Sequence, residues 1–277
     1  MTYEKLTSTD YEEVLSFLLK APEMNVVLLN NMSKFGLEQG DSPFNADYMG
    51  RRGVAGLEAV GALYNLGALF FHAQSPRSMS GMGSYIVKLE RAPVYTAGTR
   101  SHMEVLLGEL AEHALLDPDV KESHFMVLEG KVHGSAPTTG VRAATADDLD
   151  TLVRLQSDFD LEAFGKNVVG AQDVRKLLSN QMAEGAAIVV EEDGRIVSKA
   201  EATVAHPWAA LVGGVYTVPE ERGRGLSTRC MSVLCEELLG RVPVAGLNVF
   251  EDNHAARRVY VKAGFRIVEE WLTAEMV

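Results

Sequence analysis

The sequence predicts an α/β protein of the α+β kind with two domains, and three observations support this prediction. The chain has 277 residues, which suits two domains of ordinary size or one large domain. Strand-like and helix-like segments alternate along its whole length. Near the middle, residues 129–140 lack apolar periodicity and are rich in residues that break regular structure. We therefore expect one domain over residues 1–135 and a second over residues 141–277.

The first half begins with two segments at helical spacing, near Tyr11–Lys20 and Asn25–Phe35. The segments after them favour strands, apart from one helix: strands at 54–61, 62–65, 68–72, 84–87, 94–98 and 124–128, and a helix at 101–115. Two helices, a meander of strands and a βαβ-like unit repeat the layout of the second half. The first domain is therefore expected to be a degenerate copy of the second; the alternative is an unrelated α+β module.

The second half opens with a strand at Val141–Thr145. The segment Thr145–Asp148 has the pattern of a helix N-cap with an acidic residue three positions on, and apolar residues follow at helical spacing. A second helix is expected at 171–184. Three strands are expected next, at 186–192, 195–205 and 209–218, and Asp193-Gly194 between the first two is typical of a hairpin turn.

Two more helices, a strand between them and a final strand complete the predicted elements. Four apolar residues recur at every fourth position and indicate one face of a helix that Gly240 ends: Leu226, Cys230, Leu234 and Leu238. Asn253 is a good N-cap for a last short helix. Gly264 suits the left-handed position at the end of that helix, and Phe265 begins the last strand.

The composition limits the partners of the chain. A formal net charge of −12 argues against nucleic acid as the main partner and fits a cationic or amine-bearing substrate. No basic leader pattern and no run of 18 apolar residues occurs, so we expect no membrane partner and a cytoplasmic location. Cys230 and Cys235 fall five positions apart in one predicted helix, so they indicate core residues in a reducing compartment rather than a disulfide.

No metal site is expected. Five histidines of the first half lack metal-ligand spacing with a third ligand: His72, His102, His113, His124 and His133. They indicate surface or core positions.

The stretch Val215–Ser227 has the pattern of a strand, a tight basic turn and the start of a helix. At the N-terminus of a helix, backbone N–H groups point outward and the helix dipole favours an anion. Gly223 and Gly225 let the backbone approach a ligand closely, and Arg222 and Arg224 add positive charge. In an acidic chain, the simplest explanation is a ligand that carries a diphosphate; the alternative is a solvated turn.

Two common nucleotide-binding motifs do not match the sequence of this turn. The Walker pattern G-x-x-x-x-G-K-[ST] is absent. The dinucleotide pattern G-x-G-x-x-G is unmet, because Thr228 stands where the third glycine belongs. These mismatches disfavour a nucleotide-binding enzyme, which stays an alternative hypothesis and would require the chain to bind ATP or NAD.

Two motifs resemble those of the GNAT superfamily of N-acyltransferases. The segment Arg222–Ser227 is similar to the coenzyme A pyrophosphate loop [QR]-x-x-G-x-[GA], with Ser227 in place of Gly or Ala. The segment Asn253–Phe265 is similar to the signature N-x-x-A-x-x-x-Y-x-x-x-G-F. The resemblance covers nearly all of residues 141–277 and implies a mixed, mostly antiparallel twisted sheet flanked by helices in each domain. The whole chain resembles bacterial tandem-GNAT acetyltransferases whose N-terminal copy has lost the cofactor signature.

The resemblance implies an acetyl-CoA (acyl-CoA) cosubstrate and no metal. In the family, the strand before the loop separates from its neighbour at a bulge, and Gly213-Gly214 is a candidate for that bulge or a relief of packing. Amides of Val215 and Thr217 would then face the pantetheine. The residues expected to bind the cosubstrate are Val215, Tyr216, Thr217, Val218, Arg222, Gly223, Arg224, Gly225, Leu226, Ser227, Thr228, Asn253, Ala256 and Tyr260.

The resemblance also implies catalytic groups. Tyr260 matches the tyrosine that gives a proton to the departing thiolate; the alternative is a ring packed on the sheet. Many relatives carry a carboxylate on the strand before the loop, but Ala209–Val218 contains no Asp or Glu. Glu201 on the preceding strand is the first candidate for a general base, Glu162 is the second, and ordered water is the alternative.

The expected function is acetyl-CoA-dependent N-acetyl transfer to a primary amine, by direct transfer. The alternative is a catalytically silent acyl-CoA-binding module that acts in sensing or assembly. The sequence does not identify the acceptor, which can be a small amine, an amino acid, an antibiotic or a protein lysine. It also leaves open the acyl chain length, the role of the first domain and the oligomeric state, with a homodimer as one arrangement.

Overall fold

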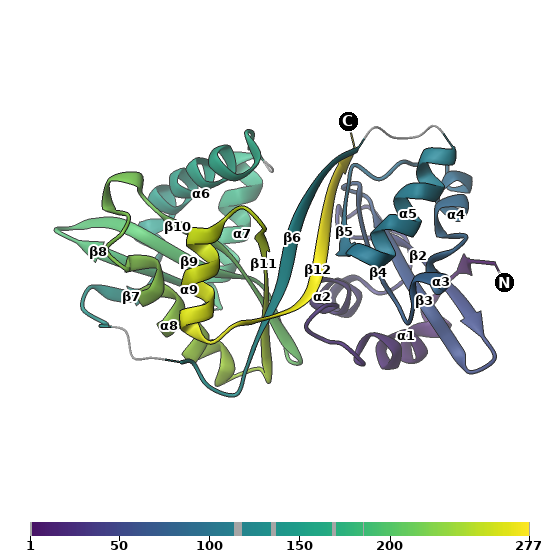
Figure 1. Ribbon diagram of the computed structural model, residues 1–277, viewed down its shortest axis with the longest axis horizontal. Helices are drawn as coiled ribbons and strands as arrows, with labels where there is room; N and C mark the ends of the chain where they lie inside the picture. Colours follow the sequence, from purple (N-terminus) through teal and green to yellow (C-terminus); the bar gives the residue numbers. More distant parts are fainter. Residues whose placement is uncertain (1, 114–117, 134–136, 168–169, 185, 277) are drawn as a thin grey trace. The chain divides into compact units, whose positions relative to one another are not determined.

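The computed structural model describes residues 2–113, 118–133, 137–167, 170–184 and 186–276 (Figure 1). They form two compact units: Met1–Phe125 with Asn248–Asp252 and Ile267–Val277, and Met126–Leu247 with Asn253–Arg266. This division differs from the expected ranges 1–135 and 141–277, because the last residues join the first unit. Part of the predicted connection over 129–140, residues 134–136, lies outside the described residues, as does the predicted helix end at Leu115.

The first unit is a sheet with helices on both faces. Its strands lie in the order β1-β2-β3-β4-β5-β12. Its elements are β1 Glu4–Lys5, α1 Tyr11–Leu18, α2 Val26–Phe35, β2 Ala46–Gly53, β3 Gly56–Tyr64, β4 Ala68–Ala73, α3 Pro76–Met79, α4 Met82–Lys88, β5 Tyr95–Thr99, α5 Arg100–Glu112, the first part of β6 Pro118–Glu129, and β12 Arg266–Met276. Neighbouring strands are antiparallel, except that β4 and β5 pair in parallel.

Alternation along the strands builds two hydrophobic clusters in this unit. Tyr48 and Met49 are adjacent on β2, yet Tyr48 packs with residues of α1 and α2, and Met49 packs with residues of α3, α4 and α5. Successive side chains of a strand point to opposite faces, so one sheet buries both sets of helices.

Segment 84–87, expected as a strand, is the helix α4. The prediction was wrong because its apolar residues also fit a helix, in which Met82 and Ile86 lie four positions apart and are fully buried. A residue distant in the sequence supports this helix: the carboxylate of Glu109 on α5 accepts hydrogen bonds from the N–H groups of Gly81 (2.7 Å) and Gly83 (3.0 Å).

Two other differences concern the same sheet. The strands expected at 54–61 and 62–65 form one strand, β3, because Ala62 continues the antiparallel ladder opposite Tyr48. The strand β2 was not predicted, since Ala46–Gly53 contains three charged residues and two glycines. Pairing on both sides, with β1 and β3, favours the strand despite this composition.

The second unit confirms the predicted elements. They are the last part of β6, then β7 Val141–Ala143, α6 Leu149–Phe164, α7 Ala171–Ala183, β8 Ala187–Glu192, β9 Arg195–His206, β10 Ala209–Thr217, α8 Leu226–Leu239, the first part of β11 Val244–Phe250, and α9 His254–Ala263. The strand order is β11-β10-β9-β8-β7. The β7–β8, β8–β9 and β9–β10 pairs are antiparallel, and the β10–β11 pair is parallel.

The two units repeat one arrangement. In each, an antiparallel meander ends in a strand that pairs in parallel with the next strand over a few residues. In the first unit the described pairing of β4 with β5 ends at Leu69↔Thr96, and in the second the pairing of β10 with β11 ends at Val212↔Leu247. The expected class, two similar domains with mixed and mostly antiparallel sheets, is confirmed.

Candidate active site

The basic turn of the second unit has the geometry of an anion site. After β10, a short turn at Pro219–Glu221 leads into the loop, and Gly223 (φ +80°) and Gly225 (φ +75°) adopt left-handed conformations that favour glycine. The intrahelical bonds of α8 begin with the N–H of Arg229 donating to the carbonyl of Gly225 (3.2 Å). The N–H groups of residues 226–228 therefore have no carbonyl acceptor within the helix, and they can bind an anion.

The arginines of this loop contact carboxylates in this structure. Arg222 donates to Glu162 (2.6 Å) and to the carbonyl of Thr217 (3.0 Å), and its guanidinium lies 5.5 Å from the ring centre of Tyr216. The Glu162 carboxylate raises the pKa of Arg222 above its ordinary value. Both side chains are about half exposed, so the pair is weak and a phosphate can compete for Arg222.

Arg224 is held in a similar way. It contacts Glu192 (2.7 Å) and Glu221, and Arg229 of α8 lies 3.3 Å from the same Glu192 carboxylate. The positive charge inferred from the sequence is therefore balanced by three acids, Glu162, Glu192 and Glu221. Sequence reasoning missed this balance, because Glu162 and Glu192 come from distant elements, α6 and β8.

Glu162, the second candidate for the general base, lies at this loop. It is on the last turn of α6, and its carboxylate binds Arg222. At this position Glu162 balances the charge of Arg222, and its role as a general base stays a prediction.

The bulge expected at Gly213-Gly214 is present. Opposite β9, the register shifts between Gly213↔Glu201 and Tyr216↔Lys199, so β10 carries one extra residue there. Gly214 has φ +57°, in the left-handed region. The parallel pairing of β10 with β11 ends one residue earlier, at Val212. The two strands therefore separate where β10 bulges.

Backbone direction on β10 supports one of the two expected amide contacts. The N–H of Val218 donates to the carbonyl of Val197 on β9 (3.1 Å). Because N–H groups alternate along a regular strand, the N–H of Thr217 points away from β9 and can face a ligand between β10 and β11. Val215 lies within the bulge, where this alternation does not hold, so the contact expected of its amide stays a prediction.

A buried ion pair lies directly beside the bulge. Lys199 is fully buried and Glu201 is 2% exposed. The Nζ of Lys199 donates to the Glu201 carboxylate and to Oε1 of Gln156 on α6 (2.6 Å). A Cβ on Gly214 would stand 3.0 Å from both Oε2 of Glu201 and Nζ of Lys199. The first candidate for the base therefore lies where the two strands separate.

Lys199 is a functional candidate that sequence reasoning missed. It stands two residues before Glu201 in β9, so both side chains point to the same face of the strand. Charged residues are almost never fully buried unless they are paired. A Lys and a Glu two residues apart in a strand rich in Val and Ala therefore indicate a buried ion pair, and the sequence alone could have shown this.

The segment Asn253–Phe265 forms the helix α9 together with the residues at its two ends. Oδ1 of Asn253 accepts from the N–H of Ala256 (3.0 Å), so Asn253 is the N-cap of α9. Gly264 (φ +107°) ends the helix as expected, and its N–H donates to the carbonyl of Tyr260 (3.1 Å). Tyr260 is 8% exposed, and its ring centre lies 6.2 Å from that of Phe265. Burial raises the pKa of Tyr260, so its phenol keeps its proton at neutral pH.

The other residues predicted to bind the cosubstrate differ in how exposed their side chains are. The side chains of Tyr216, Val218 and Leu226 are buried, so their contribution to a ligand site is through the main chain. Gly223, Arg224 and Gly225 are exposed, and Ser227, Thr228 and Ala256 are half-buried.

Three further findings concern the described residues only. Within them, no group of three or more His, Cys, Asp or Glu side chains could hold a metal ion. The described helices include none that is long and apolar enough for a membrane span. Cys230 and Cys235 are free and buried in α8.

Residues 152–265 match the model of the acetyltransferase (GNAT) family. No curated protein matches the chain significantly. Among solved structures, a Drosophila protein is similar with a TM-score of 0.72 and 12% identity, over 99% of this chain and 98% of that one. A GCN5-related N-acetyltransferase from Sphaerobacter thermophilus has a TM-score of 0.63 and 15% identity, over 98% and 94%. A tandem GNAT protein from the clavulanic acid biosynthesis pathway has a TM-score of 0.51 and 15% identity, over 98% and 97%. At these identities the likeness shows the fold.

Proposed function

We propose that the chain is an acetyl-CoA-dependent N-acetyltransferase, because residues 152–265 match the model of the acetyltransferase (GNAT) family. Acyl transfer is the general activity of the family. The acetyl donor and a primary amine acceptor, on a small molecule or a protein, are our proposal. The first unit, which we propose to be a degenerate copy of the second, would shape the acceptor site or support assembly. A cytoplasmic location without nucleic-acid or membrane partners stays a prediction.

One observation supports the proposal most. One unit brings together the anion loop after β10, the outward amide of Thr217 on β10, and the buried carboxylate of Glu201 on β9 beside the bulge. A diphosphate at residues 222–228 would allow the pantetheine to follow β10 toward the bulge. The thioester would then lie at Gly214, beside the carboxylate. Holding a thioester and an amine together in this way is a large part of what acyl transfer needs.

The proposed reaction is direct transfer. The neutral amine attacks the thioester carbonyl carbon, a C–N bond forms and the C–S bond breaks. Glu201 accepts the amine proton, directly or through water, and Lys199 balances the charge of that carboxylate. The thiolate leaves and takes a proton from the phenol of Tyr260, which burial keeps protonated. No electron transfer and no metal is required.

Tyr260→Phe is expected to lower turnover by about 100-fold while coenzyme A binds with nearly the parent dissociation constant, because a proton donor acts in the transition state only. The change keeps the ring that packs near Phe265. Steady-state thiol release and calorimetry on the same preparation measure the two quantities. Equal turnover in the variant and the parent would remove Tyr260 from the mechanism.

Glu162→Gln is expected to tighten coenzyme A binding by about two- to fivefold, since it frees Arg222 from a half-exposed ion pair. Glu220→Gln is the matched control, because it removes a similarly exposed partner from Arg195. Calorimetric titration with coenzyme A compares the three proteins. If Glu162→Gln binds more weakly than the parent, Glu162 does not compete with the diphosphate.

A second candidate function is a silent acyl-CoA-binding module. The absence of Asp and Glu from Ala209–Thr217, together with the engagement of Glu201 by Lys199, favours it. Coenzyme A binding without thiol release on a broad panel of amines would support the module. Release of thiol with any amine supports the transferase.

A further inference from the structure

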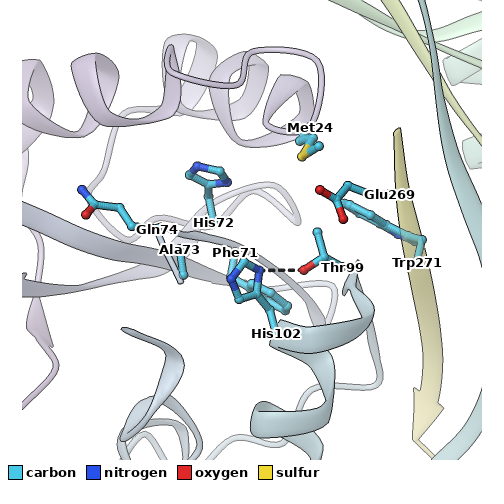
Figure 2. Close-up of a pocket in the computed structure, with 10 residues that line it drawn as sticks. Met24, Phe71, His72, Ala73, Gln74, Thr99, His102, Glu269 and Trp271 are labelled. Atoms are coloured by element: carbon cyan, nitrogen blue, oxygen red, sulfur yellow. Dashed lines mark hydrogen bonds between the residues drawn. The ribbon is translucent and has the colours of Figure 1, made fainter. Parts of the chain in front are cut away.

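A pocket in the first unit lies apart from the residues proposed for acyl transfer. Its volume is about 210 Å³. It lies at the ends of β4 and β5, and Figure 2 shows side chains of both strands, of α5 and of β12 around it. The lining residues that matter for the argument are Phe71, His72, Thr99, His102, Glu269 and Trp271.

The shape of the pocket follows from the separation of β4 and β5. Their described pairing ends at Leu69↔Thr96, and beyond it the ring of Phe71 lies against Gly98. The approach is so close that a Cβ on Gly98 would come within 2.5 Å of the ring. The ring therefore fills part of the space between the strands. What remains suits a compact ligand, and it would not hold a long chain such as pantetheine.

One buried donor in the pocket lacks a partner. Trp271 is 8% exposed, and its indole Nε1 has no hydrogen-bond partner among the described residues. The indole stacks on Phe125, with ring centres 5.0 Å apart and planes at 29°. Buried N–H groups are almost always paired. The indole nitrogen is covered by its neighbours, so a small shift of these side chains on binding would bring it to an oxygen of the bound molecule, which would supply the missing acceptor.

The charges of the lining side chains favour a cation. Burial lowers the pKa of His72 to about 4 and also lowers that of His102, so both imidazoles are neutral at pH 7. His102 shares a 2.7 Å hydrogen bond with Thr99, drawn in Figure 2. Glu269 is exposed, and the ten lining residues include no Lys or Arg. Aromatic faces next to a carboxylate attract an ammonium group.

We propose that this pocket binds a compact organic ammonium ion that carries a hydroxyl or carbonyl oxygen. The ammonium lies by Glu269 and the aromatic rings of Phe71 and Trp271, and the oxygen accepts from the indole N–H. The site would make the first unit a receptor for a small amine-bearing molecule. It does not depend on coenzyme A, so it can stand or fall separately from the proposed acyl transfer.

The indole N–H itself reports binding. The chain has two tryptophans, and Trp208 is 49% exposed in the turn between β9 and β10. In the full chain with Trp208→Phe, Trp271 gives the only indole N–H signal in a nitrogen-edited proton NMR spectrum. Choline and ethanolamine are titrated without coenzyme A. The control is the uncharged alcohol in which a carbon atom replaces the choline nitrogen.

We expect the cations to shift the Trp271 signal, and choline to bind about tenfold more tightly than its uncharged counterpart. Glu269→Gln is expected to weaken choline binding about fivefold, as for loss of an exposed partner. Glu270→Gln removes the neighbouring carboxylate, which contacts Arg100 (2.9 Å) and does not line the pocket, and is expected to change nothing. The proposal is overturned if neither cation shifts the signal, if the uncharged alcohol binds equally well, or if both Gln variants behave alike.

Discussion

Arg222→Glu is expected to weaken coenzyme A binding by about 10- to 100-fold, the cost of losing a charge-assisted hydrogen bond to phosphate and adding a repulsive charge. Arg222 stands at the first position of the loop, and its only described ion-pair partner is the half-exposed Glu162. Calorimetry gives the dissociation constant. Arg222→Lys, which keeps the charge and loses the planar fork, is expected to give an intermediate constant.

The matched control for this prediction is Arg175→Glu. Arg175 is on α7, has 48% of its side chain exposed against 43% for Arg222, and contacts Asp150 in a similar surface pair. Arg175→Glu changes the net charge of the protein by the same amount as Arg222→Glu. A similar loss of affinity in both variants would mean that overall charge, and not the loop, governs binding.

Glu201→Gln is expected to lower turnover by about 100-fold or more, with coenzyme A affinity near that of the parent, because a general base is lost. Lys199→Met is expected to destabilise the protein by about 3 to 5 kcal/mol, since it leaves a buried carboxylate without its cation. Denaturant unfolding and thiol release measure these effects.

The double variant Lys199→Met with Glu201→Leu separates stability from chemistry. Apolar replacement of a whole buried pair is often neutral for folding, so we expect most of the unfolding free energy of the parent to return. Turnover is expected to stay low. If the double variant recovers both stability and turnover, the pair serves the fold alone and another group, such as ordered water, takes the proton.

Local patterns predicted much of the second unit. Three features depend on residues that are close in the sequence, so they could be predicted from the sequence alone: the hairpin at Asp193-Gly194, the cap at Asn253 and the bulge at Gly213-Gly214. The two segments that resemble family motifs, Arg222–Ser227 and Asn253–Phe265, were equally local. Contacts between distant elements were not: Lys199 with Gln156, and Arg222 with Glu162, join strand or loop to α6.

The first unit shows the same limit. Segment 84–87 lies in a helix whose first amides are bound by Glu109, a residue of another helix that is distant in the sequence. The domain ranges changed because β12, from the end of the chain, pairs with β5 from Trp271↔Thr99 to Glu275↔Tyr95. Such long-range pairing leaves no mark in the local periodicity of either strand.

Binding of coenzyme A is expected to depend on its diphosphate, which the main chain and guanidinium groups of residues 222–228 would hold. Calorimetry compares the parent protein with coenzyme A, with dephospho-coenzyme A, which keeps the diphosphate and lacks the 3′-phosphate, and with pantetheine, which lacks the diphosphate and the adenosine part. Coenzyme A and dephospho-coenzyme A are both expected to bind at least about 100-fold more tightly than pantetheine. No heat of binding with coenzyme A, or an affinity for dephospho-coenzyme A equal to that for pantetheine, would show that these residues do not hold the diphosphate.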